Sequence, residues 1–242
     1  MHTELTIGGI SIDVIFKDIK NVHLSVYPPT GRVHISAPRR MSLENVRLFA
    51  ISKIGWIKRH QAKIQDQPRE SPREYLERES HYVWGRRYLL TIQEGGAKST
   101  VSLGVRTLEL TVPDGASPDI KEEALSEWYR AELRKRAAHL LDKWAKHLNV
   151  ELRAFYIQRM KTKWGSSNPQ RKTVRLNLEL AKFPPECLDY VTLHETAHFI
   201  VPNHSPEFIA ILDRNLPGWR TIRDRLNEGP LPCFSQPVNK DA

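Results

Sequence analysis

The stretch His194-Glu195-Thr196-Ala197-His198 constrains the fold of this 242-residue sequence more than any other segment. Residues four apart lie on one face of a helix, so a helical backbone would direct both imidazoles toward the same point. Glu195 is rotated about a third of a turn from His194, which suits a general base that lies beside a metal ion without binding it. The spacing therefore predicts a metal-binding helix with a carboxylate next to the metal.

A third histidine, His204, follows this helix after a short exit segment. Pro202 cannot continue a helix without cost, and Asn203 tolerates left-handed backbone angles. The chain can therefore turn back and bring His204 to the other two histidines, which gives the three protein ligands typical of a catalytic zinc site. The histidine spacing equals that of the extended metzincin signature, but Val201 replaces its glycine, so we expect a turn of different construction.

The motif lies in a strongly apolar segment. Tyr190, Leu193, Ala197 and Ile200 recur at helical spacing, and we expect the helix to run from about residue 186 to 200. Histidines and a glutamate are costly to bury in such a helix unless they are paired or bound to metal. The alternative is a helix whose histidines are satisfied by ordinary core or surface contacts. The third histidine and the apolar setting favour the metal.

The composition is that of a globular protein, with 40% hydrophobic residues and charges of both signs. The N-terminus lacks the basic and apolar pattern of a signal peptide, and no segment is long and apolar enough to span a membrane. Two cysteines, Cys187 and Cys233, do not suggest the disulfide framework of secreted domains. We therefore expect a cytoplasmic protein that does not associate with membranes.

The net charge is +9 and the pI is about 9.6. Such a balance attracts polyanions, so weak nucleic-acid binding through the basic surface is one expectation. A basic but inert surface explains the charge equally well. The expected partners are a polypeptide substrate or a nucleotide.

The sequence predicts an α+β protein, because groups of short strands alternate with amphipathic helices. No internal repeat is evident in the sequence. We expect four regions: N-terminal antiparallel strands and a helix in residues 1–66, a second small antiparallel meander in 67–116, a core of helices and a sheet in 117–227, and a disordered tail in 228–242.

Two helices are predicted from their start signals. Ser42 is a suitable N-cap for a helix that reaches about Gln65. Ser117 and Pro118 begin a long helix that ends near Leu148, since proline is favoured at the first helical position.

Four motifs together resemble one known family. They are Arg159-x-Lys161-x-Lys163-Trp164-Gly165-Ser166, Leu176-Asn177-x-x-Leu180, Asp189-Tyr190-Val191-x-x-His194-Glu195-x-x-His198 and Asn203-His204-Ser205-x-x-Phe208. This combination, within residues 152–226, resembles the YgjP-like metallohydrolases, which are relatives of the SprT-like and WLM zinc peptidases.

The resemblance implies a zincin-like α+β core with Glu195 as the catalytic base. It also implies a zinc cofactor held by His194, His198 and His204. Two positions differ from the family: Ser167 stands where cysteine is frequent, and Thr196 where a large apolar residue is usual. Neither position is an expected ligand, so zinc binding should persist.

The leading hypothesis is a zinc-dependent hydrolase, most simply a metallopeptidase. Glu195 would take a proton from a zinc-bound water and pass it to the leaving amine. We expect the strand around residues 174–178 to be a sheet edge beside the site, where an extended peptide could add as a further strand.

The alternative is a metal-dependent nucleotide phosphohydrolase that acts on a nucleoside triphosphate. A basic cluster that converges on the metal would bind the phosphates. Against this, no glycine-rich phosphate loop is present, and three histidines suit zinc better than magnesium. The basic residues in question are Arg159, Lys161, Lys163, Arg171 and Lys172.

A third hypothesis is a nucleic-acid-binding module with a structural metal. Structural zinc sites are normally closed by four protein ligands, often cysteines. Neither cysteine lies at ligand spacing from the histidines, which makes this the weakest of the three hypotheses.

Overall fold

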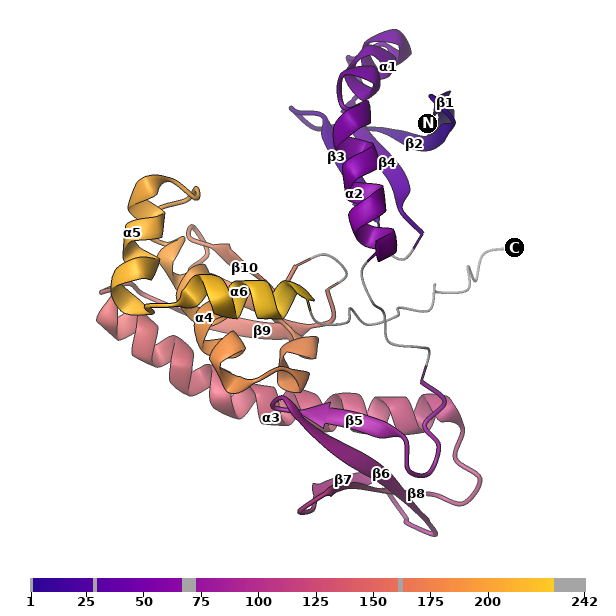
Figure 1. The fold of residues 1–242 in the computed structure, drawn as a ribbon, viewed down its shortest axis with the longest axis vertical. Helices are drawn as coiled ribbons and strands as arrows, with labels where there is room; N and C mark the ends of the chain where they lie inside the picture. Colours follow the sequence, from indigo (N-terminus) through magenta and orange to yellow (C-terminus); the bar gives the residue numbers. More distant parts are fainter. Residues whose placement is uncertain (1, 28–29, 67–72, 161–162, 229–242) are drawn as a thin grey trace. The chain divides into compact units, whose positions relative to one another are not determined.

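Three mixed β-sheets and the helices that follow them make up the chain in the computed structural model, which confirms the α+β class (Figure 1). The structure describes residues 2–27, 30–66, 73–160 and 163–228. Lys161, Cys233 and residues 229–242 of the expected tail (228–242) lie outside these ranges. The chain divides into two units, with the described residues up to 66 in unit 1 and those from 73 in unit 2. None of the helices within the described ranges combines the length and apolar character that a bilayer crossing requires.

Unit 1 is a four-stranded sheet followed by two helices. Its strand order is β1-β2-β4-β3, and β2 and β4 are parallel. The expectation of purely antiparallel strands is therefore wrong at this pair, because the alternation of apolar residues is the same for either strand direction. The elements are β1 (His2–Ile7), β2 (Ile10–Lys17), β3 (His23–Tyr27), β4 (Arg32–Pro38), α1 (Leu43–Ser52) and α2 (Ile54–Asp66).

Ser42 caps α1 as expected, since its side chain accepts a hydrogen bond from the backbone N–H of Asn45. The single helix predicted to reach Gln65 is instead broken at Lys53, which separates α1 from α2. Lys53 leaves the helical region at ψ 3° and bonds back to Ala50.

Unit 2 begins with a second four-stranded sheet, of order β5-β6-β8-β7. Strands β6 and β8 are parallel, so the expected antiparallel meander is a mixed sheet. Its apolar face packs against the first half of α3 around Leu125. The elements are β5 (Ser80–Val83), β6 (Arg86–Glu94), β7 (Thr100–Leu103), β8 (Thr107–Val112) and α3 (Pro118–His147).

The first sheets of the two units share one topology, although the sequence shows no evident repeat. Each has an antiparallel first hairpin, a parallel central pair, an antiparallel last pair and then a helix. Both first hairpins turn through two residues of positive φ, Gly8-Gly9 and Trp84-Gly85. The alternating buried residues of β4 (Val33, Ile35, Ala37) correspond to those of β8 (Leu108, Leu110, Val112). Because only burial and turn geometry are shared, the repeat becomes visible in the structure and not in residue identities.

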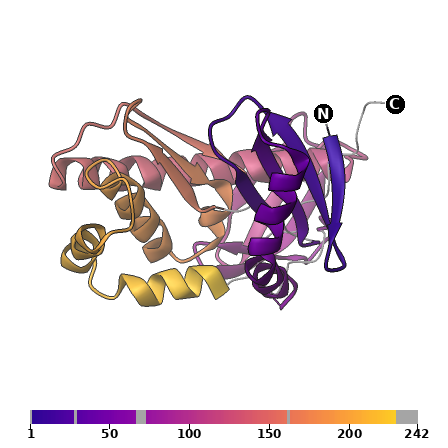
Figure 2. The ribbon, with the colours of Figure 1, turned by 90° about the horizontal axis from the view of Figure 1, so that it is seen from above.

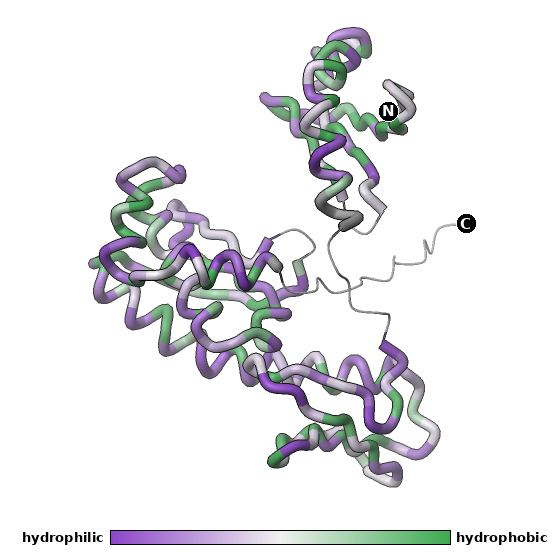
Figure 3. The backbone as a smooth tube through the Cα atoms, viewed as in Figure 1, coloured by the Kyte–Doolittle hydropathy of each residue, from purple (hydrophilic) through white to green (hydrophobic). Residues whose placement is uncertain are grey.

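The rest of unit 2 is built around the second half of α3. A three-stranded sheet of order β10-β11-β9 packs on this helix together with α4, and α6 lies beside α4 (Figure 2). Hydrophilic and hydrophobic residues alternate along α3 (Figure 3), as expected for a helix that buries one side. The elements are β9 (Ala154–Gln158), β10 (Gly165–Asn168), β11 (Thr173–Asn177), the 3-10 helix η1 (Leu178–Lys182), α4 (Pro185–Ala197), α5 (Pro206–Asn215) and α6 (Trp219–Glu228).

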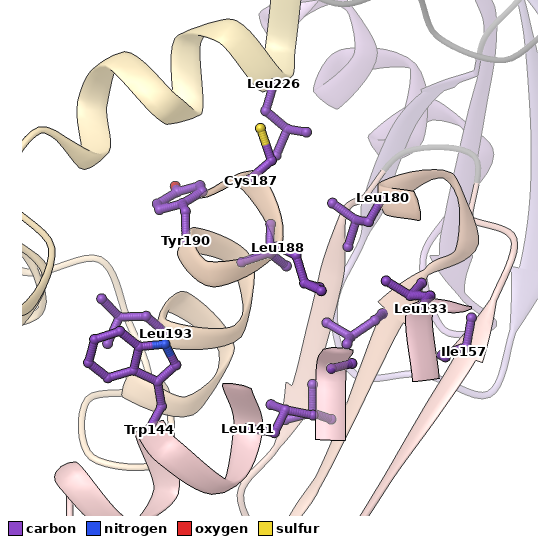
Figure 4. Close-up of a cluster of buried hydrophobic side chains, with 14 of the residues drawn as sticks. Leu133, Leu141, Trp144, Ile157, Leu180, Cys187, Leu188, Tyr190, Leu193 and Leu226 are labelled. Carbon is purple, nitrogen blue, oxygen red and sulfur yellow. The ribbon is translucent and has the colours of Figure 1, made fainter. Parts of the chain in front are cut away.

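The main hydrophobic core of unit 2 fixes α4 in place. Leu193 of α4 faces Trp144 of α3, and Cys187 of α4 faces Leu226 of α6 (Figure 4). The indole N–H of Trp144 donates to the carboxylate of Asp189 at 2.7 Å, which adds a directional contact between α3 and α4. The helix that carries the motif is therefore held on two sides.

Candidate functional site

The C-terminal end of α4 presents the histidine–glutamate motif. Pro185 occupies the start of the helix, where its missing N–H costs no hydrogen bond, and Ala197 ends it with His198 as the C-cap. The expected end at Ile200 is wrong. The backbone N–H groups of Phe199 and Ile200 each bond at 3.0 Å to the carbonyl three residues back, which is the tighter spacing of a 3-10 turn. The chain thus leaves α4 at the second histidine of the motif.

The three histidines come together at this exit. One ring nitrogen from each histidine lies within 4.8 Å of one ring nitrogen of each of the others, and Nε2 of His194 is 3.1 Å from Nε2 of His204. Two nitrogens held about 2.0–2.1 Å from one tetrahedral zinc ion lie about 3.3 Å apart, so this separation fits a shared metal. The structure therefore places the three residues singled out by the spacing, His194, His198 and His204, in one metal-sized cluster.

Hydrogen bonds orient two of these rings. Nδ1 of His198 lies 3.1 Å from the backbone oxygen of Val201. A carbonyl oxygen only accepts, so Nδ1 carries the proton and Nε2 keeps its lone pair. Nδ1 of His194 lies 3.5 Å from the hydroxyl oxygen of Tyr190. Contacts of this kind fix the ring orientation of metal-binding histidines.

The local environment keeps two of the imidazoles neutral. Burial, together with the positive charges that His198 and His204 would carry, lowers the pKa of His194 to about 3. Burial also lowers the pKa of His198. Neutral imidazole is the form that binds a metal ion, so neither ring needs to lose a proton at neutral pH before binding.

Phe208 supports the cluster from α5. Its side chain is completely buried. Its ring centroid lies 5.0 Å from that of His194, 4.6 Å from His198 and 4.9 Å from His204. One aromatic side chain thus contacts all three imidazoles. The sequence included Phe208 only as part of a family motif, and its spacing alone gave no reason to place it beneath the histidines.

Glu195 lies beside the cluster and is 6% exposed. Its carboxylate faces the backbone of Gly165 in β10, where an added Cβ would be 2.6 Å from Oε1. Burial raises the pKa of Glu195 to about 7, while a hydrogen bond from Ser167 and the charge of Lys163 act in the opposite direction. A glycine in a strand often marks a close backbone approach, which was the available signal for Gly165.

The histidines and Glu195 line one cleft of about 540 Å³. Its other walls come from β10 with the residues beside it and from α6. The contribution of α6 was missed in the sequence, because nothing in its amphipathic pattern says which element it packs on. The remaining lining residues are Lys163, Trp164, Gly165, Ser166, Ser167, Pro169, Tyr190, Val191, Pro202, Arg223, Leu226 and Asn227.

The sheet edge beside the cleft is β10. The expectation that residues 174–178 form this edge is wrong, because β11 (Thr173–Asn177) pairs with β10 on one side and with β9 on the other. Residues 178–182 form a 3-10 helix and do not extend the strand. The cleft-lining residues Gly165, Ser166 and Ser167 belong to β10 itself.

Asn177 at the end of β11 holds the segment that leads into β10. Its side-chain amide donates to the carbonyl oxygens of Met160 and Lys163, at 2.9 Å each. Its side-chain oxygen accepts from the backbone N–H groups of Met160 at 3.3 Å and Glu179 at 3.2 Å. Asn177 is 3% exposed. This buried residue therefore fixes both ends of the segment that carries Lys163.

The basic residues considered for phosphate binding do not converge on the cleft. Among those that the structure describes, Lys163 lines it, while Arg159, Arg171 and Lys172 do not. Arg159 instead pairs with Glu122 and bonds to Ser126 on α3, and Lys172 pairs with Glu151. Lys161 lies outside the described residues.

No curated protein sequence matched the chain. The crystal structure of the metallopeptidase zymogen of Methanocaldococcus jannaschii jannalysin is similar, with 28% identity over 37% of this chain and 92% of that chain and a TM-score of 0.35. The metallopeptidase zymogen of Pyrococcus abyssi abylysin has 22% identity over 37% of this chain and 90% of that chain, also with a TM-score of 0.35.

The sequence profile described as "YgjP-like, metallopeptidase domain" matches residues 20–229, which is most of the chain. The protein therefore belongs to the YgjP-like family of metallopeptidase domains and is a metallohydrolase.

Proposed function

We propose that the cleft is the active site of a zinc-dependent peptidase, in which His194, His198 and His204 hold the zinc and Glu195 acts as the general base. Three imidazole nitrogens favour zinc over magnesium or calcium, which prefer oxygen ligands. Within the described residues, neither a cysteine nor a carboxylate joins this donor group. Three protein ligands are typical of a catalytic zinc site, whereas a structural site usually has four.

Zinc bound there would supply Lewis-acid activation of water and of the scissile carbonyl. Glu195 contributes through its position, because it follows His194 on α4 and its carboxylate lines the same cleft. A carboxylate so placed accepts the proton of the attacking water and then delivers it to the leaving amine. The contact with Gly165 limits where that carboxylate can lie.

The peptide would be bound in extended form along β10. This strand is at the edge of its sheet, and three of its residues line the cleft. Main-chain hydrogen bonds to an edge strand hold a polypeptide irrespective of most of its side chains. A peptide in this position would run past the histidine cluster and Glu195.

The main support for the proposal is that three histidine nitrogens within 4.8 Å of one another share a cleft with a buried glutamate. The chain that holds them belongs to a metallopeptidase family. The nucleotide alternative receives less support, because Arg159, Arg171 and Lys172 lie outside the cleft. The structural-metal alternative would need a fourth ligand, and Cys187 is buried against Leu226 with its pKa raised by burial to about 11.

The test is the Glu195→Gln variant, assayed for bound zinc and for cleavage of casein, an unfolded polypeptide. The amide keeps the shape of the side chain but cannot accept a proton, so we expect zinc retention and a loss of cleavage of about 100-fold or more. Glu207→Gln is the matched control, because Glu207 is an exposed carboxylate at the start of α5 outside the cleft lining. Undiminished cleavage by Glu195→Gln would disprove the role of the glutamate.

A further inference from the structure

Two cationic side chains from different elements line the cleft. Lys163 immediately precedes Trp164 and β10, and Arg223 lies in α6. Among the described residues that line the cleft, Glu195 is the carboxylate. With a divalent metal at the histidines, the cleft would therefore be strongly positive. Such a cleft attracts an anionic group on the substrate.

Arg223 differs from the other arginines of α6 in what it contacts. Arg220 pairs with Asp213 of α5 at 2.5 Å, and Arg225 pairs with Glu186 of α4 at 2.8 Å. Those two pairs join α6 to neighbouring helices. Arg223 pairs with the adjacent Asp224 at 2.7 Å, and the side chains are 43% and 55% exposed. An exposed pair of this kind is weak, so a substrate carboxylate can compete with it.

Contacts through two aromatic side chains connect Arg223 to the histidine cluster. Its guanidinium carbon lies 5.3 Å from the ring centroid of Trp219. Trp219 stacks on Tyr190 with centroids 5.9 Å apart and planes at 7°, and the hydroxyl of Tyr190 approaches His194. Trp219 and Tyr190 are 4% and 6% exposed. Two buried, stacked rings thus lie between the guanidinium and the histidine cluster.

Lys163 supplies the second charge from the β10 side. Its side chain is exposed, but its carbonyl oxygen is fixed by the 2.9 Å hydrogen bond from Asn177. Its charge also acts on Glu195, whose pKa it lowers against the larger effect of burial. Lys163 is therefore near the base while its ammonium group can reach a bound substrate.

We infer that the cleft selects peptides that carry a carboxylate beside the scissile bond, with Arg223 as its principal partner and Lys163 as a secondary one. This inference rests on the proposed peptidase function. An arginine fork matches the two oxygens of a carboxylate, and stacking on Trp219 orients it. The apolar lining residues Trp164, Val191 and Leu226 suit the side chains of a peptide. The carboxylate can come from an acidic side chain or from the peptide C-terminus.

The experiment begins by mapping the sites that the zinc-loaded protein cleaves in casein. Peptides are then built around one site, with Glu, Gln or Lys at each position flanking the cleaved bond, and each is made with a free and with an amidated C-terminus. We expect kcat/KM for the Glu peptide to exceed that of the Gln peptide by about tenfold or more, since bonds between charged groups are the stronger ones. Equal kcat/KM values for the Glu and Gln peptides, together with a fall of about tenfold or more on amidation, would identify the C-terminal carboxylate as the recognised group.

Variants of the cleft residues test whether Arg223 causes the preference for the Glu peptide. Arg223→Gln should bring the Glu-to-Gln ratio of kcat/KM near one, Arg223→Lys should keep part of it, and Arg223→Glu should reverse it toward the Lys peptide. Lys163→Gln should reduce the ratio by a smaller factor, because its charge is exposed. Arg220→Gln, on the same helix but outside the cleft lining, should keep the wild-type ratio. Thermal unfolding of each variant checks that the fold persists.

Three results would overturn the inference. If Arg223→Gln and Arg223→Glu change neither the Glu-to-Gln ratio nor the effect of amidation on kcat/KM, the inference is wrong and the proposed peptidase function stays intact. Release of phosphate from ATP that is lost in Arg223→Gln would make the recognised anion a phosphate. Absence of cleavage of casein by the zinc-loaded wild-type protein would overturn the peptidase function and the carboxylate preference together.

Discussion

The backbone of Gly165 lies directly against the carboxylate of Glu195. A Cβ at position 165 would be 2.6 Å from Oε1, 2.7 Å from Cγ and 2.9 Å from Cδ of Glu195, distances that carbon atoms do not tolerate. With the Glu195 side chain in this position, only glycine fits at position 165. One contact thus joins β10, the strand proposed to bind the peptide, to Glu195, the residue proposed to act as the base.

We predict that Gly165→Ala displaces Glu195 without disturbing the histidines. Displacement of a reacting group by about 1 Å can cost about 100-fold in rate, so casein cleavage should fall by about that factor. Zinc content should stay at the wild-type value, because the three atoms nearest to the added methyl group all belong to Glu195 and not to a histidine. The two measurements are cleavage rate and metal analysis on the same sample.

Gly55→Ala is the matched control. This glycine lies in α2 of unit 1, and an added Cβ there would meet only the end of the flexible Arg59 side chain, at 3.8 Å. Alanine in a helix is favoured over glycine by about 0.5–1 kcal/mol, so unit 1 should become slightly more stable. Cleavage by the Gly165→Ala variant at the same rate as by Gly55→Ala would show that Glu195 does not depend on the contact.

We predict that His204→Ala binds zinc much more weakly than the wild-type protein. Nε2 of His204 lies 3.1 Å from Nε2 of His194, so its removal would leave two histidine donors. Purified wild-type protein should contain about one zinc per chain, and its thermal unfolding temperature should fall when a chelator is added, because a ligand that binds only the folded state stabilises it. The variant should lack both properties.

His139→Ala tests whether loss of any histidine has this effect, since His139 is exposed on α3. Its zinc content and chelator response should equal those of the wild-type protein. Full zinc content in His204→Ala would exclude His204 from the ligand set and require another donor.

The sequence was sufficient to predict the cluster, because local rules determine it. Helical spacing joins His194 to His198, and Pro202 ends the helix before His204. Gly165 and Arg223 come from a strand and a helix far from the motif in the sequence, so only tertiary packing brings them to the cleft. The parallel pairing of β2 with β4 was missed for a related reason, since alternation of apolar residues does not reveal the direction of the neighbouring strand.

We predict that Phe208→Leu weakens zinc binding more than it weakens the fold. Leucine keeps most of the buried apolar volume in contact with α4, so the loss of unfolding free energy should be about 1.5 kcal/mol or less. The ring that contacts all three imidazoles would be absent, however, and their orientations would broaden. Competition with a zinc-sensitive dye should show an affinity lower by about tenfold or more, the size of effect found when the residues that support metal ligands are changed.

Leu212→Val provides the comparison, because Leu212 is also completely buried on α5 but has no ring contact with the histidines. It should lower stability and leave zinc affinity near the wild-type value. Equal zinc affinities in the two variants would show that Phe208 acts only through the general packing of α5.

The last prediction concerns Asn177, which makes three hydrogen bonds to the backbone of the segment before β10 and one to the backbone of Glu179 in η1. Asn177→Ala removes both amide donors to the Met160 and Lys163 carbonyls and the acceptor for the N–H of Met160 and of Glu179. A buried polar group left without its partner costs about 1–3 kcal/mol, so urea unfolding should show a free energy of unfolding that is lower by at least this amount.

The Asn177→Ala variant should also cleave casein more slowly, because the bonds of Asn177 anchor the segment before Gly165. This fall in rate should be seen at temperatures where the variant is still fully folded. Zinc content should be retained, since the hydrogen bonds described for Asn177 go to Met160, Lys163 and Glu179 and not to a histidine. Asn215→Ala loses one side-chain bond to the Ile211 carbonyl and one contact with His147 at the end of α3, and neither Asn215 nor His147 lines the cleft. It should lower stability without lowering the cleavage rate of the folded protein. If Asn177→Ala cleaves casein as fast as Asn215→Ala when both are folded, Asn177 stabilises the sheet but does not position the site.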